Sequence, residues 1–400
     1  MGTDRQQVLI EKLVYGGMGL ARIDGEVVLT PFVLPGERAT IIPDTKRGGV
    51  LRARLESLEE KSARRVPSPC PYFTRCGGCQ YQHSEYSYQA EQKIEILRDV
   101  LRRIGKLTIE DIGVVTGPEW GYRNRIQLHF DGGRMGLLEA GSHRLCPIET
   151  CPISSPKLNE LIGVLNTMVR DRRWPRFVRS LELFTNENDT QVNVLESGQK
   201  VARRFFEWCG ERIPGAMTPS LEYPAGNLTF RVGPRSFFQV NRHLIDDLVQ
   251  IALGDEHGEH ALDLYAGVGL FALPLAKRFE QVTAVESGGG AVDDLSFNAE
   301  RAGAKVTAVK ADTGSFLAEY QRTADLVIAD PPRAGMGKQV LAELIRIKPK
   351  TLVIVACDPS TLARDLAVLA GAGFRIESTT LVDLFPQTFH LEVVVRLSIC

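Results

Sequence analysis

The second half of the chain alternates short apolar runs with amphipathic stretches. The runs suit buried strands and lie at residues 261–264, 282–285, 325–329 and 352–356, with a last pair at 377–384 and 390–397. Helical stretches, such as 271–277, separate most of them. This alternation is typical of a parallel sheet with helices on both faces and antiparallel strands at its end. We therefore predict a doubly wound, Rossmann-like α/β domain over residues 228–400.

In the first sixty residues the apolar runs are shorter and follow one another more closely. Five apolar runs, at residues 7–12, 20–23, 27–31, 38–43 and 51–55, are separated by glycine-containing turns. Short strands at this spacing predict a small β-barrel of the OB type, which we assign to residues 1–60.

The middle of the chain mixes both periods. Helical periodicity covers residues 86–104 and 156–171, and strand-like runs lie between 120 and 145. A stretch rich in turn residues at 210–227 reads as a linker. We therefore predict a small α+β domain over residues 61–227, between the barrel and the doubly wound sheet.

Composition and charge fit a soluble protein. Hydrophobic residues make up 44% of the chain, charged residues 24%, and the net charge is -1. Apolar runs long enough to span a membrane and a signal-peptide pattern are both missing, so we expect a cytoplasmic protein without membrane contact, and a monomer. Residues 1–80 carry 12 Lys and Arg against 9 Asp and Glu, a net +3. This part of the chain is the better candidate for contact with an anionic partner.

Two basic clusters suit a nucleic acid. One is the group of Lys and Arg residues between Lys46 and Arg65, and the other is the group of arginines between Arg170 and Arg179 around Trp174 and Phe177. Cations contact phosphates and aromatic rings stack on bases. An ordinary solvated surface explains both clusters equally well.

Three cysteines, Cys70, Cys76 and Cys79, have the spacing C-x5-C-x2-C. In a reducing compartment such clusters hold a metal ion or an iron–sulfur cluster more often than a disulfide. A fourth ligand is required, and Cys146 and Cys151 are candidates. His83 is a further candidate if the metal is zinc.

A nucleotide-like ligand is indicated at the first strand of the α/β domain. Gly267 and Gly269 follow that strand, and Glu286 ends the next one, a spacing at which the acid can bind ribose hydroxyls. The spacing alone allows NAD. Further acids at strand ends, Asp312 and Asp330, favour S-adenosylmethionine, although they and Asp263 would also serve as loop caps.

A single thiol, Cys357, follows the apolar run 352–356. Ser360 is placed to cap a helix beginning near Thr361, and a helix N-terminus favours negative charge, so the cysteine could be held partly as thiolate. A buried core cysteine is the simpler interpretation of this residue taken alone.

Several motifs in one order resemble a known family. They are the cysteines with Cys151-Pro-Ile, Ser236-Phe-Phe-Gln-Val-Asn241, Asp263-Leu-Tyr-Ala-Gly-Val-Gly269, Glu286, Asp330-Pro-Pro-Arg-Ala-Gly335, the segment from Cys357 to Asp365 and the segment from Asp383 to Glu392. Together they resemble the RNA uridine-C5 methyltransferases that carry an N-terminal TRAM domain and an iron–sulfur cluster. The resemblance covers almost the whole chain.

The resemblance implies a role for each matched residue. Cys357 would be the nucleophile that adds to C6 of uracil, and Glu392 the base that removes the C5 proton. S-adenosylmethionine would be bound by Gln239, Tyr265, Gly267, Gly269, Glu286, Asp312 and Asp330, with Phe237 stacking on the uracil. Cys70, Cys76, Cys79 and Cys151 would hold a 4Fe-4S cluster. The implied substrate is RNA, with 23S rRNA ahead of the tRNA T-loop.

The sequence departs from the family pattern at two points. Asp358 stands where the family has asparagine, which adds a charge beside the thiol, and residues 288–290 are three glycines where a helix normally begins. A non-catalytic RNA-binding protein is therefore an alternative. Amine methylation is disfavoured because Arg333 follows the prolines, and cytosine-C5 methylation because a Pro-Cys nucleophile motif is missing.

Overall fold

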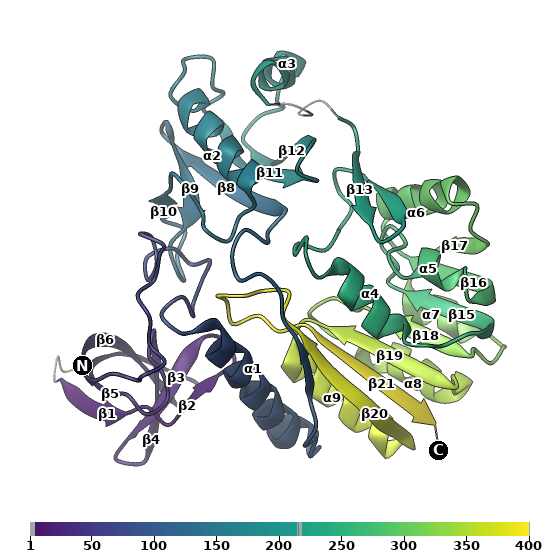
Figure 1. Cartoon of the computed structure of the whole chain (residues 1–400), viewed down its shortest axis with the longest axis horizontal. Coiled ribbons are helices and arrows are strands. Elements are labelled where there is room, and N and C mark those ends of the chain that lie inside the picture. Colours follow the sequence, from purple (N-terminus) through teal and green to yellow (C-terminus); the bar gives the residue numbers. More distant parts are fainter. Residues whose placement is uncertain (1–4, 214, 216–217, 400) are drawn as a thin grey trace.

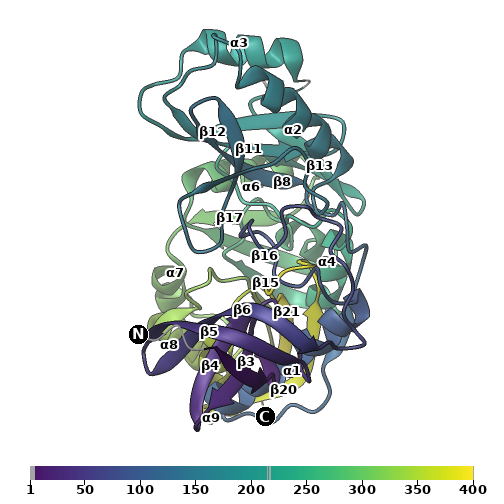
Figure 2. The same cartoon turned by 90° about the vertical axis from the view of Figure 1, so that its left-hand side faces the viewer.

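The computed structural model describes residues 5–213, 215 and 218–399. Figure 1 shows the N-terminal barrel in purple, a central sheet in teal above it, and a large sheet that ends in yellow at the C-terminus. Figure 2 shows the central sheet and its helices at one end of the molecule and the barrel at the other. Across the described residues, none of the helices is long and apolar enough to cross a membrane.

The N-terminal barrel has six strands in the order β1-β5-β6-β4-β3-β2. They are β1 (Gln6–Leu9), β2 (Lys12–Val14), β3 (Met18–Ile23), β4 (Glu26–Pro31), β5 (Arg38–Arg47) and β6 (Val50–Glu60). One more strand is present than predicted, because the run at 7–12 divides. The backbone N–H of Ile10 donates to the carbonyl of Glu37, which immediately precedes β5. The backbone N–H of Glu11 donates instead to the carbonyl of Leu20 in β3. The chain therefore changes partner strand at this corner.

The central part is an antiparallel sheet with helices packed on it. Its strands, in the order β10-β9-β8-β11-β12, are β8 (Arg125–Asp131), β9 (Arg134–Leu138), β10 (Leu145–Pro147), β11 (Val178–Thr185) and β12 (Thr190–Ser197). The helices are α2 (Pro156–Met168) and α3 (Arg203–Arg212), and a separate hairpin is formed by β13 (Leu221–Ala225) and β14 (Leu228–Val232). The prediction of a linker at 210–227 is therefore wrong where β13 lies.

Trp174 belongs to the core of this central part. Its side chain is 3% exposed, and its ring lies 4.7 Å from Phe130 and 5.6 Å from Phe205. The ring is thus unavailable for stacking on a base. Within the predicted cluster of arginines and aromatic residues, Trp174 therefore has a structural role.

The C-terminal sheet has the order β17-β16-β15-β18-β19-β21-β20-β7, and β21 is antiparallel to both neighbours. Its strands are β7 (Gly113–Val115), β15 (Gly258–Leu264), β16 (Phe279–Glu286), β17 (Val306–Lys310), β18 (Leu326–Ala329), β19 (Thr351–Ala356), β20 (Phe374–Val382) and β21 (Val393–Ile399). The helices are α4 (Ile245–Leu253), α5 (Ala272–Leu275), α6 (Gly289–Arg301), α7 (Thr313–Glu319), α8 (Gly337–Ile347) and α9 (Pro359–Gly371). The predicted doubly wound fold is confirmed.

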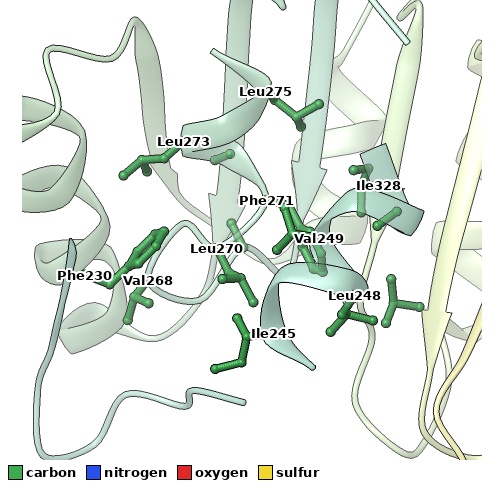
Figure 3. Packing of buried hydrophobic residues seen from close by; sticks show 14 of the residues in the cluster. Phe230, Ile245, Leu248, Val249, Val268, Leu270, Phe271, Leu273, Leu275 and Ile328 are labelled. Atoms are coloured by element: carbon green, nitrogen blue, oxygen red, sulfur yellow. The ribbon is translucent and has the colours of Figure 1, made fainter. Parts of the chain in front are cut away.

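Each face of this sheet carries its own apolar layer. In β19, Val353 and Val355 join the layer formed with α4, α5 and α6, whereas Leu352 and Ile354 join the layer formed with α7, α8 and α9. Figure 3 shows the first layer, to which α4 contributes Leu248, α5 contributes Leu273 and β18 contributes Ile328. A strand that is buried on both faces needs a continuous apolar run, and such runs allowed these strands to be predicted from the sequence.

Helix α1 (Tyr86–Val100) packs in the C-terminal part of the fold, although β15, the first strand of the parallel core, begins more than a hundred residues later in the chain. Ile96 and Leu97 belong to the same apolar layer as α9. A π-helix, Leu101–Gly105, continues α1, and β7 (Gly113–Val115) then pairs in parallel with β20. The division of the chain at residues 60 and 227 stays a prediction, and this segment links its second and third parts.

Candidate active site

Cys357 lies directly between β19 and α9. The N-cap of α9 is Asp358, whose Oδ1 accepts hydrogen bonds of 2.9 Å from the backbone N–H groups of both Ser360 and Thr361. The prediction that Ser360 caps this helix is wrong by two residues. An asparagine oxygen would make the same bonds, so the departure from the family pattern preserves the cap.

The Cys357 thiol lies close to two carboxyl groups. Burial, together with smaller contributions from the charges of Glu392 and Asp330, raises the pKa of the thiol to about 11, and Arg333 opposes this shift. The expectation that the helix N-terminus holds Cys357 partly as thiolate is therefore wrong for the free protein. Burial and neighbouring negative charge outweigh the favourable field of the helix end.

Glu392 and Asp330 are perturbed for the same reason. Glu392 is 4% exposed, immediately precedes β21, and has a pKa raised well above its usual range by burial and by Asp330. Asp330 follows β18, and burial raises its pKa to about 7. Two interacting carboxyl groups beside one thiol are the arrangement expected of groups that exchange protons.

A cavity of about 940 Å³ lies beside the ends of β15 and β16. Gly267, Glu286, Phe237 and the glycines at 288–290 are among the residues that line it. The two carboxylate oxygens of Glu286 accept hydrogen bonds from the backbone N–H groups of Gly267 (3.1 Å) and Gly288 (2.6 Å). The cavity has the size and the acidic wall that a nucleoside ligand needs.

The two predicted glycines have different surroundings. Gly267 has a φ of +54°, and a Cβ added there would meet nothing within 4 Å. Gly269 has a φ of +94°, and a Cβ added there would lie 2.6 Å from both Leu273 and Leu295. Only Gly267 faces open space, so only Gly267 borders the cavity directly.

We expect Gly267→Ala to impair mainly cofactor binding and Gly269→Ala to impair mainly stability. Alanine at Gly267 should weaken binding of S-adenosylmethionine at least about tenfold and cost about 1 kcal/mol of stability for its positive φ. Alanine at Gly269 should cost more, about 2–4 kcal/mol, because the buried leucines have no space to move. Titration calorimetry measures the affinity for S-adenosylmethionine, and thermal unfolding measures the stability. If both variants weaken binding to the same extent, the placement of Gly267 at the cofactor cavity is contradicted.

The remaining predicted cofactor residues, Gln239, Tyr265, Asp312 and Asp330, do not line this cavity. Gln239 is 4% exposed and Tyr265 is half-buried with a φ of +64°. Asp312 caps α7 by accepting a bond of 3.0 Å from the backbone N–H of Ser315. This is the loop-cap role foreseen as the alternative for Asp312, so contact of this residue with a ligand stays a prediction.

The segment that carries Phe237 is held by the central part of the chain. The guanidinium of Arg125 donates to the carbonyl of Ser236 at 3.3 Å, and the amide of Asn124 donates to the carbonyl of Gln239 at 2.9 Å. Phe237 itself is 60% exposed. Sequence reasoning missed Asn124 and Arg125, although two polar residues at the start of an otherwise alternating strand were a usable signal.

The barrel also reaches the site, which the sequence did not reveal. Tyr15, just after β2, has its ring 5.5 Å from Phe389, and its hydroxyl lies 3.5 Å from the carbonyl oxygen of Cys357. Burial and the charge of Asp358 raise the pKa of Tyr15. The barrel is therefore in contact with the backbone that presents the thiol.

The four cysteines of the predicted cluster share one cavity. Cys70, Cys76, Cys79 and Cys151 all line a hollow of about 540 Å³, whereas Cys146 and His83 do not. His83 stacks on Phe73 at 5.6 Å instead. Within the described ranges, groups of three or more His, Cys, Asp or Glu side chains that could hold a metal ion are absent. The hollow brings four thiols together without closing them around one point.

Taken together, the sheet order, the glycine turn after β15 and the acid that ends β16 define a class I methyltransferase. Residues 217–399 match the family described as tRNA (Uracil-5-)-methyltransferase, and residues 3–55 match the TRAM domain.

Similar proteins cover nearly the full chain. An uncharacterized RNA methyltransferase of Thermotoga maritima is 31% identical over 98% of this chain and 98% of its own. A 23S rRNA (uracil(1939)-C(5))-methyltransferase of Halomonas elongata is 32% identical over 97% of this chain and 88% of its own. The solved Pyrococcus abyssi tRNA (uracil-54, C5)-methyltransferase, in complex with S-adenosyl-L-homocysteine, is 26% identical, covers 98% of this chain and 100% of its own, and superposes with a TM-score of 0.78. The chain belongs to the RNA uracil-C5 methyltransferase family.

Proposed function

We propose that this protein transfers a methyl group from S-adenosylmethionine to C5 of a uridine in RNA, with Cys357 as nucleophile and Glu392 as general base. The observation that supports the proposal is the position of these two residues in neighbouring strands. They come from the end of β19 and the start of β21, which are antiparallel neighbours, with Ala356 opposite Val393. The cavity beside Gly267 and Glu286 supplies space for the cofactor.

The chemistry requires both groups. C5 of uracil is a weak nucleophile until a thiolate adds to C6 and turns the ring into an enolate. S-adenosylmethionine supplies an electrophilic methyl group. Glu392 then takes the C5 proton, the C5–C6 double bond reforms and the Cys357 sulfur leaves C6. The raised pKa of Glu392 makes its carboxylate a stronger base for this step.

We infer that the substrate is a uridine in 23S rRNA. The Halomonas elongata relative is named for 23S rRNA and the Pyrococcus abyssi structure for tRNA. The test is transfer of labelled methyl groups to unmodified 23S rRNA and tRNA in parallel, followed by nuclease digestion and mass mapping. Label recovered as 5-methyluridine in rRNA supports the proposal, and label only in tRNA changes the substrate. Label in neither RNA would favour the non-catalytic RNA-binding alternative.

The pH dependence of adduct formation follows from the state of the thiol. Because the pKa of Cys357 lies at about 11, the thiolate fraction at neutral pH is small and grows about tenfold per pH unit. The charge of Asp330 contributes to this raised thiol pKa, and Asp330 itself, with a pKa of about 7, carries that charge only above that pH. We expect adduct formation with 5-fluorouridine RNA to rise steeply with pH, with a shallower slope only near pH 7, where Asp330 ionises. A flat profile would show that free thiolate does not limit this step.

We further propose that Cys70, Cys76, Cys79 and Cys151 hold a 4Fe-4S cluster with a structural role. Four thiols lining one hollow are the donor set that such a cluster takes. The cysteine segment also supports the site, because the backbone N–H of Gln80 donates to the carbonyl of Gln387 at 2.9 Å.

Anaerobically purified protein is expected to contain iron and sulfide. Cys79→Ala should lose most of the iron, because it removes one of four ligands. Cys146→Ala is the matched control, since Cys146 is also buried but does not line the hollow. Iron analysis and visible absorbance measure both variants. Equal iron in the two variants would contradict the ligand assignment.

A further inference from the structure

The loop between β20 and β21, residues 383–392, is held from outside over its first half, residues 383–387. This loop carries Glu392 at its end and projects toward the centre of the molecule, in yellow in Figure 1. Its four successive carbonyls at 384–387 each accept from another segment. The donors are Asn241 Nδ2 (3.1 Å), Lys93 Nζ (2.9 Å), the Tyr122 hydroxyl (2.9 Å), and the backbone N–H groups of Gln80 and Tyr81 (2.9 and 3.0 Å).

Helix α1 contributes to this support through two side chains on one face. Gln89 and Lys93 are four residues apart, which places them one turn above the other. They are 1% and 0% exposed. The Gln89 amide donates to Gln387 Oε1 and its oxygen accepts from the Gln387 backbone N–H, both at 3.0 Å. The second bond fixes a residue with a φ of +68°, a conformation that needs external support.

Lys93 forms a fully buried ion pair at the start of the loop. Its ammonium donates to Asp383 Oδ1 at 2.6 Å, and both side chains are at most 1% exposed. Burial lowers the pKa of Lys93, and Asp383 opposes this. A buried pair of this kind seldom adds stability over an apolar pair, so its retention points to a requirement for geometry.

The loop transmits this geometry to Glu392. At its base the backbone N–H of Val382 donates to the carbonyl of Glu392 at 2.9 Å, so the loop is closed on itself beside the carboxyl group. Cys357 is presented by β19 and α9 instead. Gln89 and Lys93 bond directly to the loop that carries Glu392. The contacts that join this loop to Cys357 run through Tyr15 and through the pairing of β19 with β21.

We propose that Gln89 and Lys93 of α1 are positioning residues for Glu392, required for the proton-removal step and dispensable for addition of the Cys357 thiolate. The inference rests on the proposed function. In the affected step, the C5–H bond breaks, its proton passes to the Glu392 carboxylate, its electrons reform the C5–C6 double bond, and the C6–S bond breaks to release Cys357. Proton transfer is sensitive to a misplacement of about 1 Å, which costs on the order of 10²-fold in rate.

The test uses full-length protein in single turnover with labelled S-adenosylmethionine and unmodified RNA. The variants are Gln89→Met and the double variant Lys93→Met with Asp383→Asn, which avoids leaving one buried charge alone. We expect both to release 5-methyluridine at least about tenfold more slowly than wild type. Labelled methyl should accumulate in a covalent protein–RNA complex on denaturing gels. Trapping by 5-fluorouridine RNA should stay within about twofold of wild type, because it does not require proton removal.

Ile96→Ala is the matched control for simple loosening of α1. Ile96 is 3% exposed and packs in the apolar layer. This variant should lower the melting temperature without accumulating the complex. The inference is overturned if the test variants slow trapping and release equally, or if Ile96→Ala accumulates the same complex. Wild-type protein that traps no RNA would instead overturn the proposed function, and the trapping arm distinguishes that result.

Discussion

Replacing Cys357 with alanine is expected to lower methyl transfer to RNA by roughly 10⁴-fold or more, because no route to the C5 nucleophile remains without the thiol. The variant should also form no adduct with 5-fluorouridine RNA. The variant should still fold, because Cys357 lies outside β19 and because the N-cap of α9 is Asp358, which the substitution leaves in place. Labelled methyl transfer and denaturing gels measure the two losses.

Cys209→Ala is the matched control for loss of a buried thiol. Cys209 lies in α3 of the central part, is 0% exposed and is remote in sequence from the site motifs. This variant should keep wild-type adduct formation. Residual methylation by Cys357→Ala above the uncatalysed level would show that methyl transfer proceeds without covalent attack at C6.

Replacing Glu392 with glutamine is expected to stall the reaction one step later. Turnover should fall by about 10²–10⁴-fold, the range for loss of a general base, while methyl transfer to the bound uridine continues. The methylated covalent complex should then accumulate with ordinary RNA. Because the charge of Glu392 raises the pKa of Cys357, its removal should also shift adduct formation with 5-fluorouridine RNA toward lower pH.

Glu377→Gln provides the surface control for this charge change. Glu377 lies in β20, the strand that pairs with β21 next to Glu392. Its carboxylate accepts hydrogen bonds from Arg375 and Ser398, outside the site. It should leave both turnover and the pH profile unchanged. Failure of Glu392→Gln to accumulate a methylated complex would mean that another group, with Asp330 the first to examine, removes the proton.

The candidate site was visible in the sequence to the extent that its residues stand at strand ends. Gly267, Glu286, Asp330 and Cys357 each follow or end a readable apolar run, and strands of a parallel sheet bring such ends to one edge. In the structure the charges of Asp330 and Glu392 act on the thiol and raise its pKa. The state of the thiol was misjudged, because burial depends on neighbours that no local pattern describes.

The doubly wound sheet and the barrel were determined by local sequence. Continuous apolar runs mark strands buried on both faces, and short runs broken by glycine mark a small barrel. Element ends were less certain: the expected helix 271–277 is α5, Ala272–Leu275, and α3 was not predicted. Helix ends depend on capping bonds, as Asp358 shows, and these are made in three dimensions.

The support behind Glu392 was decided only by tertiary structure. Lys93 and Asp383 are 290 residues apart, and Gln89 and Gln387 are 298 apart. In sequence, Gln89 and Lys93 are two polar positions on an amphipathic helix, where solvent exposure is the usual expectation. They are buried because the 383–392 loop brings backbone carbonyls and a carboxylate to that face of α1. Polar partners of this kind are fixed by where the chain returns, which hydrophobic periodicity does not encode.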